Sequence, residues 1–209
     1  MDRGRRFEKL FEPGRIGTME IKNRIVMPAM ATNLASEDGY ITDQIISYYE
    51  ERAKGGVGLI VVEFSCVEFP RGRPTSRQVC ISDDRYLPGL TKLAKAIKKQ
   101  GARAAIQLHH GGRQVSSRNA YCQPAAPSPV AKPSSLIAGT RHKVDIPHEL
   151  TLGEIEELTG LFAQAAERAK RAGFDGVEIH GASDYLLAQF LSSAATGVLI
   201  GMGGSWRTE

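Results

Sequence analysis

The sequence predicts an α/β protein with a parallel sheet, built from about four consecutive strand–helix units. Two observations predict this class. Segments with strand character alternate with segments of helical periodicity along the 209-residue chain, and repeated βα units are typical of parallel sheets. The segment VGLIVVEF at 57–64 is apolar and β-branched without a break, which indicates that both of its faces are covered.

The first half of the sequence contains two strand segments and two helical segments after a short hairpin. Pro28 ends the first strand because proline cannot donate to a ladder. Thr42 or Asp43 can cap the first helix through side-chain oxygens, and Gly55 and Gly56 follow its last turn. The expected elements are, in order, a hairpin at Ile16–Ile21, a first buried strand at Arg24–Met27, a helix from its cap at Thr42 or Asp43 to Gly55, the strand at 57–64 and a helix at Leu87–Lys99.

The second half adds a strand, a long polar segment and a long helix. Residues 102–112 are expected to form a strand that runs into glycines. Residues 114–150 are polar and rich in proline, and a segment of this length between packed elements is typical of a functional loop or lid. Thr151 and Glu154 match a capping box for a helix that ends at Ala172. The core face of this helix is expected to carry Ile155, Leu158, Phe162, Ala165 and Ala169.

The remaining elements follow from residues 174–191, FDGVEIHGASDYLLAQFL. A short buried strand at Gly176–Ile179 is expected to place His180 at its C-terminal end. Tyr185 follows five residues later, ahead of an apolar helical run. Histidine and tyrosine are both able to handle protons, so this stretch is the candidate catalytic centre.

Two architectures fit this order of elements, an open doubly wound sheet and a (β/α)8 barrel. The doubly wound nucleotide-binding fold expects GxGxxG after the first strand, and the sequence there is PAMATNLA. Polar residues at the C-terminal ends of successive strands are typical of barrels. A barrel needs about 250 residues, so we expect the fold class to be a truncated TIM (β/α)8 barrel, namely its N-terminal half, with two unpaired sheet edges.

Composition and charge exclude several classes of protein. The formal net charge is +4. The sequence lacks the basic stripe with interleaved aromatic residues that nucleic-acid binding requires, so nucleic acid is not an expected partner. No apolar run reaches the roughly 20 residues of a membrane span, and residues 1–10, expected to be frayed, do not resemble a secretory signal. The three cysteines form no CxxC motif, which predicts neither a metal site nor disulfides and favours a cytoplasmic location.

The residues that follow the four strands suit a planar heteroaromatic ring with carbonyl and imide edges. Gln107 can donate and accept hydrogen bonds at the same time, as such an edge requires. The strand-end residues are Pro28, Ala29, Met30 and Ala31 after the first strand, Glu63 and Phe64 at the second, Gln107, His109 and His110 at the third, and His180, Ser183 and Tyr185 after the fourth.

Four motifs carry a resemblance to a known family. They are LFEPGRIGTMEIKNRIVMPAMATN, ERAKGGVGLIVVE, IQLHHGGRQ, and RAGFDGVEIHGA followed by YLLAQFLS. Between about residue 10 and residue 192, the sequence resembles the Old Yellow Enzyme family of FMN-dependent oxidoreductases. The resemblance is greatest to its branch of NADH:flavin oxidoreductases and 2,4-dienoyl-CoA reductases.

The resemblance implies a cofactor, a reductant and a role for each site residue. FMN would lie against Pro28, Ala29, Met30 and Ala31 and against the backbone of Phe64, with Gln107 at its pyrimidine edge. His180 would approach the flavin and bind the carbonyl oxygen of an α,β-unsaturated substrate. Tyr185 would protonate the α-carbon after hydride transfer, and NAD(P)H would be the electron donor. For His110 and Arg113, which also match the family, a structural and a functional role remain equally open.

The sequence departs from the family pattern at three places. Ser183 stands where a second donor, His or Asn, is usual in the substrate site, and Asp184 replaces a usual glycine. Residues 194–209 lose most of the family motif, and we hypothesise that the reading frame is shifted from about residue 194. Strands five to eight, which carry the FMN phosphate site in the family, have no counterpart in this sequence. The cysteine cluster of this branch has none either, so no iron–sulfur cluster is expected.

Two functional hypotheses therefore follow from the sequence. The first is an FMN-dependent oxidoreductase of ene-reductase type. The alternative is a non-catalytic fragment that requires a complementing partner or a second copy, as a homo-oligomer, to complete the barrel.

Overall fold

The structure is a computed structural model that describes residues 7–132 and 145–196. Its centre is a four-stranded parallel sheet in the order β3-β4-β5-β8. The strands are β3 (Val26–Met27), β4 (Leu59–Cys66), β5 (Arg103–His109) and β8 (Gly176–Ile179). The order of these strands in the sheet equals their order in the chain, as in the predicted barrel.

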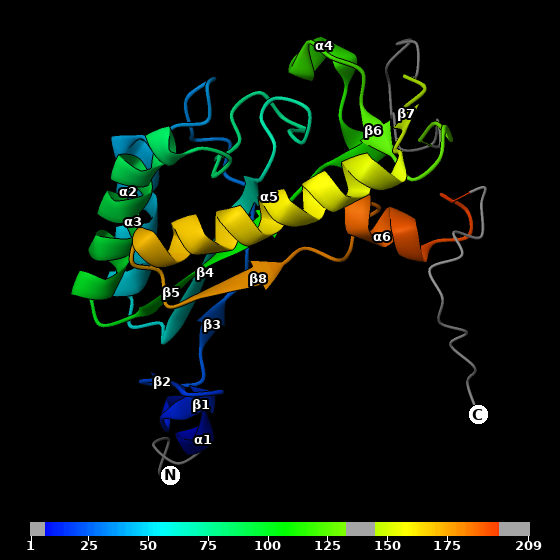
Figure 1. Ribbon diagram of the computed structural model, residues 1–209. Coiled ribbons are helices and arrows are strands. Elements are labelled where there is room, and N and C mark those ends of the chain that lie inside the picture. The colour runs from blue at the N-terminus through cyan, green and yellow to red at the C-terminus, as the bar shows by residue number, and fades with distance from the viewer. Residues whose placement is uncertain (1–6, 133–144, 197–209) are drawn as a thin grey trace, which may run out of the picture.

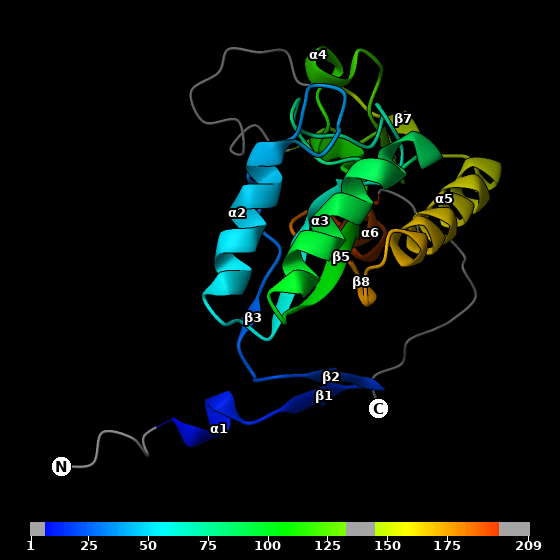
Figure 2. The ribbon, with the colours of Figure 1, turned by 90° about the vertical axis from the view of Figure 1, so that its left-hand side faces the viewer.

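Three long helices cover one face of this sheet (Figures 1 and 2). They are α2 (Asp43–Lys54), α3 (Leu87–Lys99) and α5 (Leu152–Arg171). The largest core cluster joins them to the sheet, with Ile45 and Tyr49 from α2, Leu93 from α3, Ala165 from α5 and Ile106 from β5. Burial of these apolar side chains is the main source of stability for the sheet.

The predicted helix caps are confirmed. The side chain of Thr42 accepts a hydrogen bond from the backbone N–H of Ile45. Thr151 and Glu154 form the capping box of α5. On the predicted core face of α5, Leu158, Ala165 and Ala169 are buried, whereas Ile155 and Phe162 are partly exposed.

Among the described elements, a hairpin covers the opposite face of the sheet near its N-terminal end. The predicted hairpin, β1 (Gly14–Ile16) and β2 (Met19–Ile21), lies below β3 with α1 (Glu8–Phe11) (Figure 1). Ile21 packs there with Leu59, Val61 and Ala105 in a second, small apolar cluster.

The prediction that the first and fourth strands are buried is wrong. Val26 in β3 is 43% exposed, and Val177 and Ile179 in β8 are 40% and 51% exposed. In the described part of the chain these two strands are the edges of the sheet, so each has a strand on one side only. Their apolar sequence indicated burial that the described elements do not provide.

The polar segment after β5 has structure of its own. It contains the turn η3 (Gly112–Gln114), α4 (Ser117–Ala120), and the paired short strands β6 (Ala125–Ala126) and β7 (His148–Glu149). The turn η2 (Asp84–Tyr86) precedes α3, and α6 (Leu186–Leu191) follows β8. Residues 133–144, and residues 197–209 of the atypical tail, lie outside the described residues. None of the described helices is long and apolar enough to cross a membrane.

Candidate functional site

The site lies at the C-terminal edge of the parallel sheet, where β4, β5 and β8 end. Residues of β5 alternate between the two faces, so Ile106 and Leu108 join the helix-side core. Gln107 and His109 therefore lie on the open face. Gln107 is paired in register with Glu178 of β8, and its amide donates to the Glu178 carboxylate at 2.6 Å.

Four aromatic rings meet at this edge, and we call them the ring cluster: Phe64, His109, His180 and Tyr185. The ring centroids of His180 and Tyr185 are 4.9 Å apart in an edge-to-face arrangement. Those of His109 and Tyr185 are 4.3 Å apart, and the Phe64 ring lies 4.7 Å from His109. The structure thus brings His180 and Tyr185 together with Phe64 and His109, the other two rings at the strand ends.

His180 is held as a neutral hydrogen-bond donor. Its Nδ1 accepts a hydrogen bond from the backbone N–H of Ala182 at 3.3 Å, which assigns the ring proton of the neutral form to Nε2. Burial lowers the pKa of His180, with the Glu178 carboxylate acting in the opposite direction. A neutral imidazole with a free Nε2–H is suited to donate to a carbonyl oxygen.

Tyr185 stands at the start of α6 as its N-cap residue. Burial raises the pKa of its phenol, so the group keeps its proton over the whole physiological range. A phenol in this state is suited to act as a general acid.

His109 lies at the end of β5 and belongs to the site, although the sequence predicted no role for it. It is 1% exposed, and neither ring nitrogen has a hydrogen-bond partner among the described residues. Burial, together with the nearby His110 and His180, lowers its pKa to about 2. Alternation along β5 was the available signal, because it places His109 on the same face as Gln107.

The loop after β3 contributes an exposed rim to the site. Within Pro28–Ala31, Met30 is 47% exposed and Ala29 packs against the small cluster below.

Glu63, which is 1% exposed, fixes the end of this loop by accepting from the N–H and hydroxyl of Thr32 at 3.1 and 2.6 Å. The phenol of Tyr49 donates to the same carboxylate oxygen at 3.2 Å. Burial raises the pKa of Glu63.

His110 has a structural position. Its Nε2 lies 2.8 Å from the Glu68 carboxylate, and its Nδ1 accepts from the N–H of Gly112 at 3.1 Å. Burial raises the pKa of Glu68, but hydrogen bonds from His110 and Arg71 outweigh it and lower the pKa to about 2. Both ring nitrogens of His110 are occupied within the protein, so the ring is not directed at a ligand.

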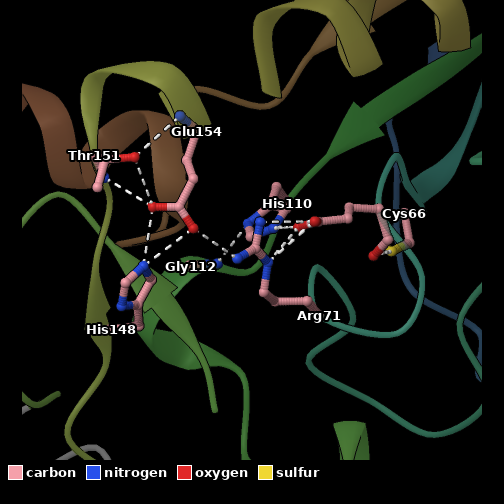
Figure 3. A network of polar contacts seen from close by, with 8 residues as sticks. Cys66, Arg71, His110, Gly112, His148, Thr151 and Glu154 are labelled. Carbon is pink, nitrogen blue, oxygen red and sulfur yellow. Dashed lines mark hydrogen bonds and ion pairs between the residues drawn. The ribbon is translucent and has the colours of Figure 1, made fainter. Parts of the chain in front are cut away.

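Arg71 extends this contact to the start of α5. It pairs with Glu68 at 2.8 Å and with Glu154 at 3.3 Å. Glu154 also contacts His148 at 2.9 Å, and Figure 3 shows these side chains together with Thr151. The network connects the loops after β4 and β5 to the N-terminus of α5.

Ser183 and Asp184 lie in the loop between His180 and Tyr185. Ser183 is exposed and has a φ of 59°, and it has no place in the ring cluster. Asp184 instead forms an ion pair with Arg113, with their atoms 2.8 Å apart. The predicted substrate contact of Ser183 stays a prediction.

The chain belongs to the NADH:flavin oxidoreductase / NADH oxidase family, whose profile it matches over residues 9–205. It is 47% identical over 201 residues to an NADH oxidase of Thermoanaerobacter brockii, which covers 96% of this chain and 30% of the oxidase. An NADPH dehydrogenase of Clostridium acetobutylicum is 42% identical over 184 residues, covering 88% of this chain and 51% of the dehydrogenase. The chain thus spans about a third to a half of the length of these relatives.

Solved structures of the family have the same fold. An old yellow enzyme homologue from Zymomonas mobilis matches with a TM-score of 0.82 and 30% identity, covering 94% of this chain and 55% of the homologue. A 2-naphthoyl-CoA reductase matches with a TM-score of 0.86 and 30% identity, covering 95% and 31%. The four described strands are therefore the N-terminal half of a TIM barrel, which confirms the predicted fold class.

The described residues fit the ring system of a flavin. The Gln107 amide carries a donor and an acceptor at the open face, His180 offers an Nε2–H, and the Pro28–Ala31 loop forms an exposed rim at the same edge. The Gln107 amide bonds to Glu178 in this structure, so binding of a flavin edge there requires that bond to open or to be shared.

Proposed function

We propose that this chain forms the flavin-facing half of an FMN-dependent oxidoreductase of ene-reductase type. The reaction is hydride transfer from reduced FMN to an activated C=C bond, with NAD(P)H as the reductant. The observation that carries the proposal is the pairing of His180 and Tyr185, whose ring centroids are 4.9 Å apart at the sheet edge.

In this proposal the cofactor-binding residues are distributed over four strand ends. The loop Pro28–Ala31 lies against the flavin, Phe64 contributes its backbone, and Gln107 and His180 bind the polar edge of the ring. FMN supplies the hydride when it is bound. The protein contributes the position of the ring and the proton-handling groups in front of it.

His180 and Tyr185 divide the remaining chemistry between them. The Nε2–H of His180 donates to the carbonyl oxygen of the substrate and stabilises the negative charge that develops on it. Tyr185 donates its phenolic proton to the α-carbon. The lowered pKa of His180 and the raised pKa of Tyr185 keep one group neutral and the other protonated, as these roles require.

The substrate class is a small α,β-unsaturated carbonyl compound. The names of relatives support this class, because a Vibrio harveyi protein that is 42% identical over 186 residues is an NADH:acrylate oxidoreductase. Acrylate is an α,β-unsaturated carboxylate. Ser183 is the candidate for a second substrate contact through its hydroxyl.

A second candidate function is favoured by the open face of the sheet. Val177 and Ile179 in β8 are 40% and 51% exposed, and large apolar surface left open on a sheet favours association. In this alternative the chain is a non-catalytic fragment that becomes competent only with a complementing partner or a second copy.

Flavin binding and turnover distinguish the two candidates. We expect the purified chain to bind added FMN, seen as quenched flavin fluorescence, and to reduce an α,β-unsaturated ketone with NAD(P)H. Tyr185→Phe should slow this turnover about a hundredfold or more, the typical contribution of a general acid. Tyr121→Phe is the matched control, because Tyr121 is 88% exposed and outside the ring cluster. A chain that binds no FMN supports the fragment, and equal turnover of the two variants contradicts the role of Tyr185.

A further inference from the structure

We infer that the ion pair between Arg113 and Asp184 positions Tyr185 against His180. The inference rests on the proposed function, because it gives the Arg113–Asp184 ion pair a role in holding Tyr185, the proposed general acid. It concerns two residues on different elements, Arg113 in η3 after β5 and Asp184 in the loop after β8. Asp184 immediately precedes Tyr185 in the chain.

The pair has the geometry of a specific, two-point contact. The Nε and Nη2 atoms of Arg113 donate to the two carboxylate oxygens of Asp184 at 3.0 and 2.8 Å. The Arg113 side chain is 6% exposed and that of Asp184 is 26% exposed. The side chain of Gln114 donates to the same carboxylate. A bidentate pair shielded from water fixes orientation as well as distance.

The backbone of Asp184 requires such support. Ser183 and Asp184 have φ values of 59° and 54°, so two successive residues with side chains occupy the left-handed region. Glycine adopts this conformation without strain, whereas other residues retain it only where the surroundings hold them. The structure shows what an aspartate makes possible at this position, namely the two-point contact with Arg113.

A second contact joins the same two loops. Gln189 in α6 is completely buried, and its Oε1 accepts from the backbone N–H of Arg113 at 3.1 Å. Its Nε2 donates to the backbone carbonyl of Asp184. Beyond Tyr185, the N–H of Leu186 donates to the carbonyl of His110 at 3.1 Å. Contacts with the loop after β5 therefore flank Tyr185 on both sides.

The consequence is that the direction of the Tyr185 ring is set from β5 as well as from β8. His180 is attached to β5 by its own N–H, which donates to the Leu108 carbonyl at 3.0 Å. The positions of both members of the proposed catalytic pair are thus fixed relative to β5. Loss of the Arg113–Asp184 contact should release Tyr185 from the ring cluster while His180 stays in place.

Three variants test this inference through the ionisation of Tyr185. Asp184→Asn removes the charge, and Asp184→Gly removes the side chain but restores the residue that suits the backbone. Asp84→Asn is the matched control, because Asp84 also pairs with arginines, Arg168 and Arg171 at 2.9 Å, but on the helical side of the sheet. The phenol of Tyr185 is titrated by NMR with isotope-labelled tyrosine, and its signal is assigned by its loss in Tyr185→Phe.

We expect both Asp184 variants to lower the pKa of Tyr185 toward its ordinary value of 10.0, because the ring becomes more exposed, and Asp84→Asn to leave it unchanged. If Asp184→Gly titrates like the unaltered chain while folded, the pair does no more than relieve backbone strain and the inference is overturned. An unchanged pKa in both Asp184 variants overturns it as well.

This measurement needs neither flavin nor substrate, so its outcome is independent of whether the chain binds FMN. In a chain that turns over, Arg113→Lys provides a further comparison. Lysine keeps the charge but cannot form the two-point contact. We expect it to slow the proton-donating step while leaving the binding of FMN unchanged.

Discussion

Replacement of Glu154 by alanine is the sharpest test of how the loops at the sheet edge are held. One oxygen of the carboxylate accepts from the backbone N–H of Thr151 at 2.9 Å and so completes the capping box of α5. The same carboxylate contacts His148 of β7 at 2.9 Å and Arg71 of the loop after β4 at 3.3 Å. Figure 3 shows all four side chains in one network. A single substitution therefore removes a helix cap and two links between loops.

The expected loss of stability follows from these three contacts. A helix cap contributes about 1 kcal/mol, and each partly exposed ion pair contributes about 0.2–1 kcal/mol. We expect Glu154→Ala to lower the free energy of unfolding by about 1.5–3 kcal/mol. For a domain of this size, 1 kcal/mol shifts Tm by about 2–4 °C, so Tm should fall by about 3–12 °C.

The assay is urea unfolding followed by circular dichroism, with Glu156→Ala as the matched control. Glu156 lies two residues further along α5 and is exposed, so its replacement should change stability by less than about 0.5 kcal/mol. Glu154→Gln should fall between the two variants, because its amide oxygen can still accept from Thr151. If Glu154→Ala and Glu156→Ala are equally stable, the network does not hold these loops.

The same contacts predict how the difference depends on pH. The backbone hydrogen bond from Thr151, followed by the contact with His148, lowers the pKa of Glu154 to about 2 from an ordinary value of 4.5. A carboxylate with a lowered pKa stabilises the fold fully above pH 4.5, and this contribution disappears as the pH falls toward 2. The stability gap between Glu154→Ala and the unaltered chain should therefore shrink over that range. A gap that stays constant down to pH 2 would falsify the assignment.

Three further substitutions test separate parts of the structure. Leu93→Ala empties a completely buried position in the helix-side core and should cost about 2–5 kcal/mol in unfolding experiments; a cost below 1 kcal/mol contradicts that packing. Gly112→Ala places a methyl group against the side-chain amide of Gln189 at a φ of +58°, so it should separate the two loops and lower Tm, whereas an unchanged Tm contradicts the close approach. Phe64→Ala uncovers His109 and should raise its pKa from about 2 toward 6.5, and an NMR titration without that rise contradicts the cover by Phe64.

The elements that the sequence predicted well are those with local signals. The capping-box motif at Thr151 and Glu154 lies within four consecutive residues, and both of its hydrogen bonds are present as predicted. The continuous apolar run of β4 corresponds to a strand buried on both faces from Leu59 to Val62. Periodicity and capping depend on neighbours in the chain, so one sequence suffices to recognise them.

The errors and omissions concern contacts between distant segments. Burial of β8 was predicted from its composition, but burial depends on which elements cover it, and Val177 is 40% exposed. Arg113 and Asp184 are 71 residues apart, and no local pattern indicates that they meet. His109 illustrates an intermediate case, because alternation gives its face but only the fold gives its neighbours.

The main core and the candidate site are formed by side chains on opposite faces of the same strands. On β5, Ile106 and Leu108 anchor the helix-side core, whereas Gln107 and His109 face the open side with the candidate site. Because neighbouring residues on a strand point to opposite faces, substitutions on the open face can alter the site and leave the main core intact. Stability measured on the helix side and ionisation measured in the ring cluster should therefore respond to different substitutions. The Arg113–Asp184 contact lies in the loops above the strands, where a change in position can reach Tyr185 without first unfolding the sheet.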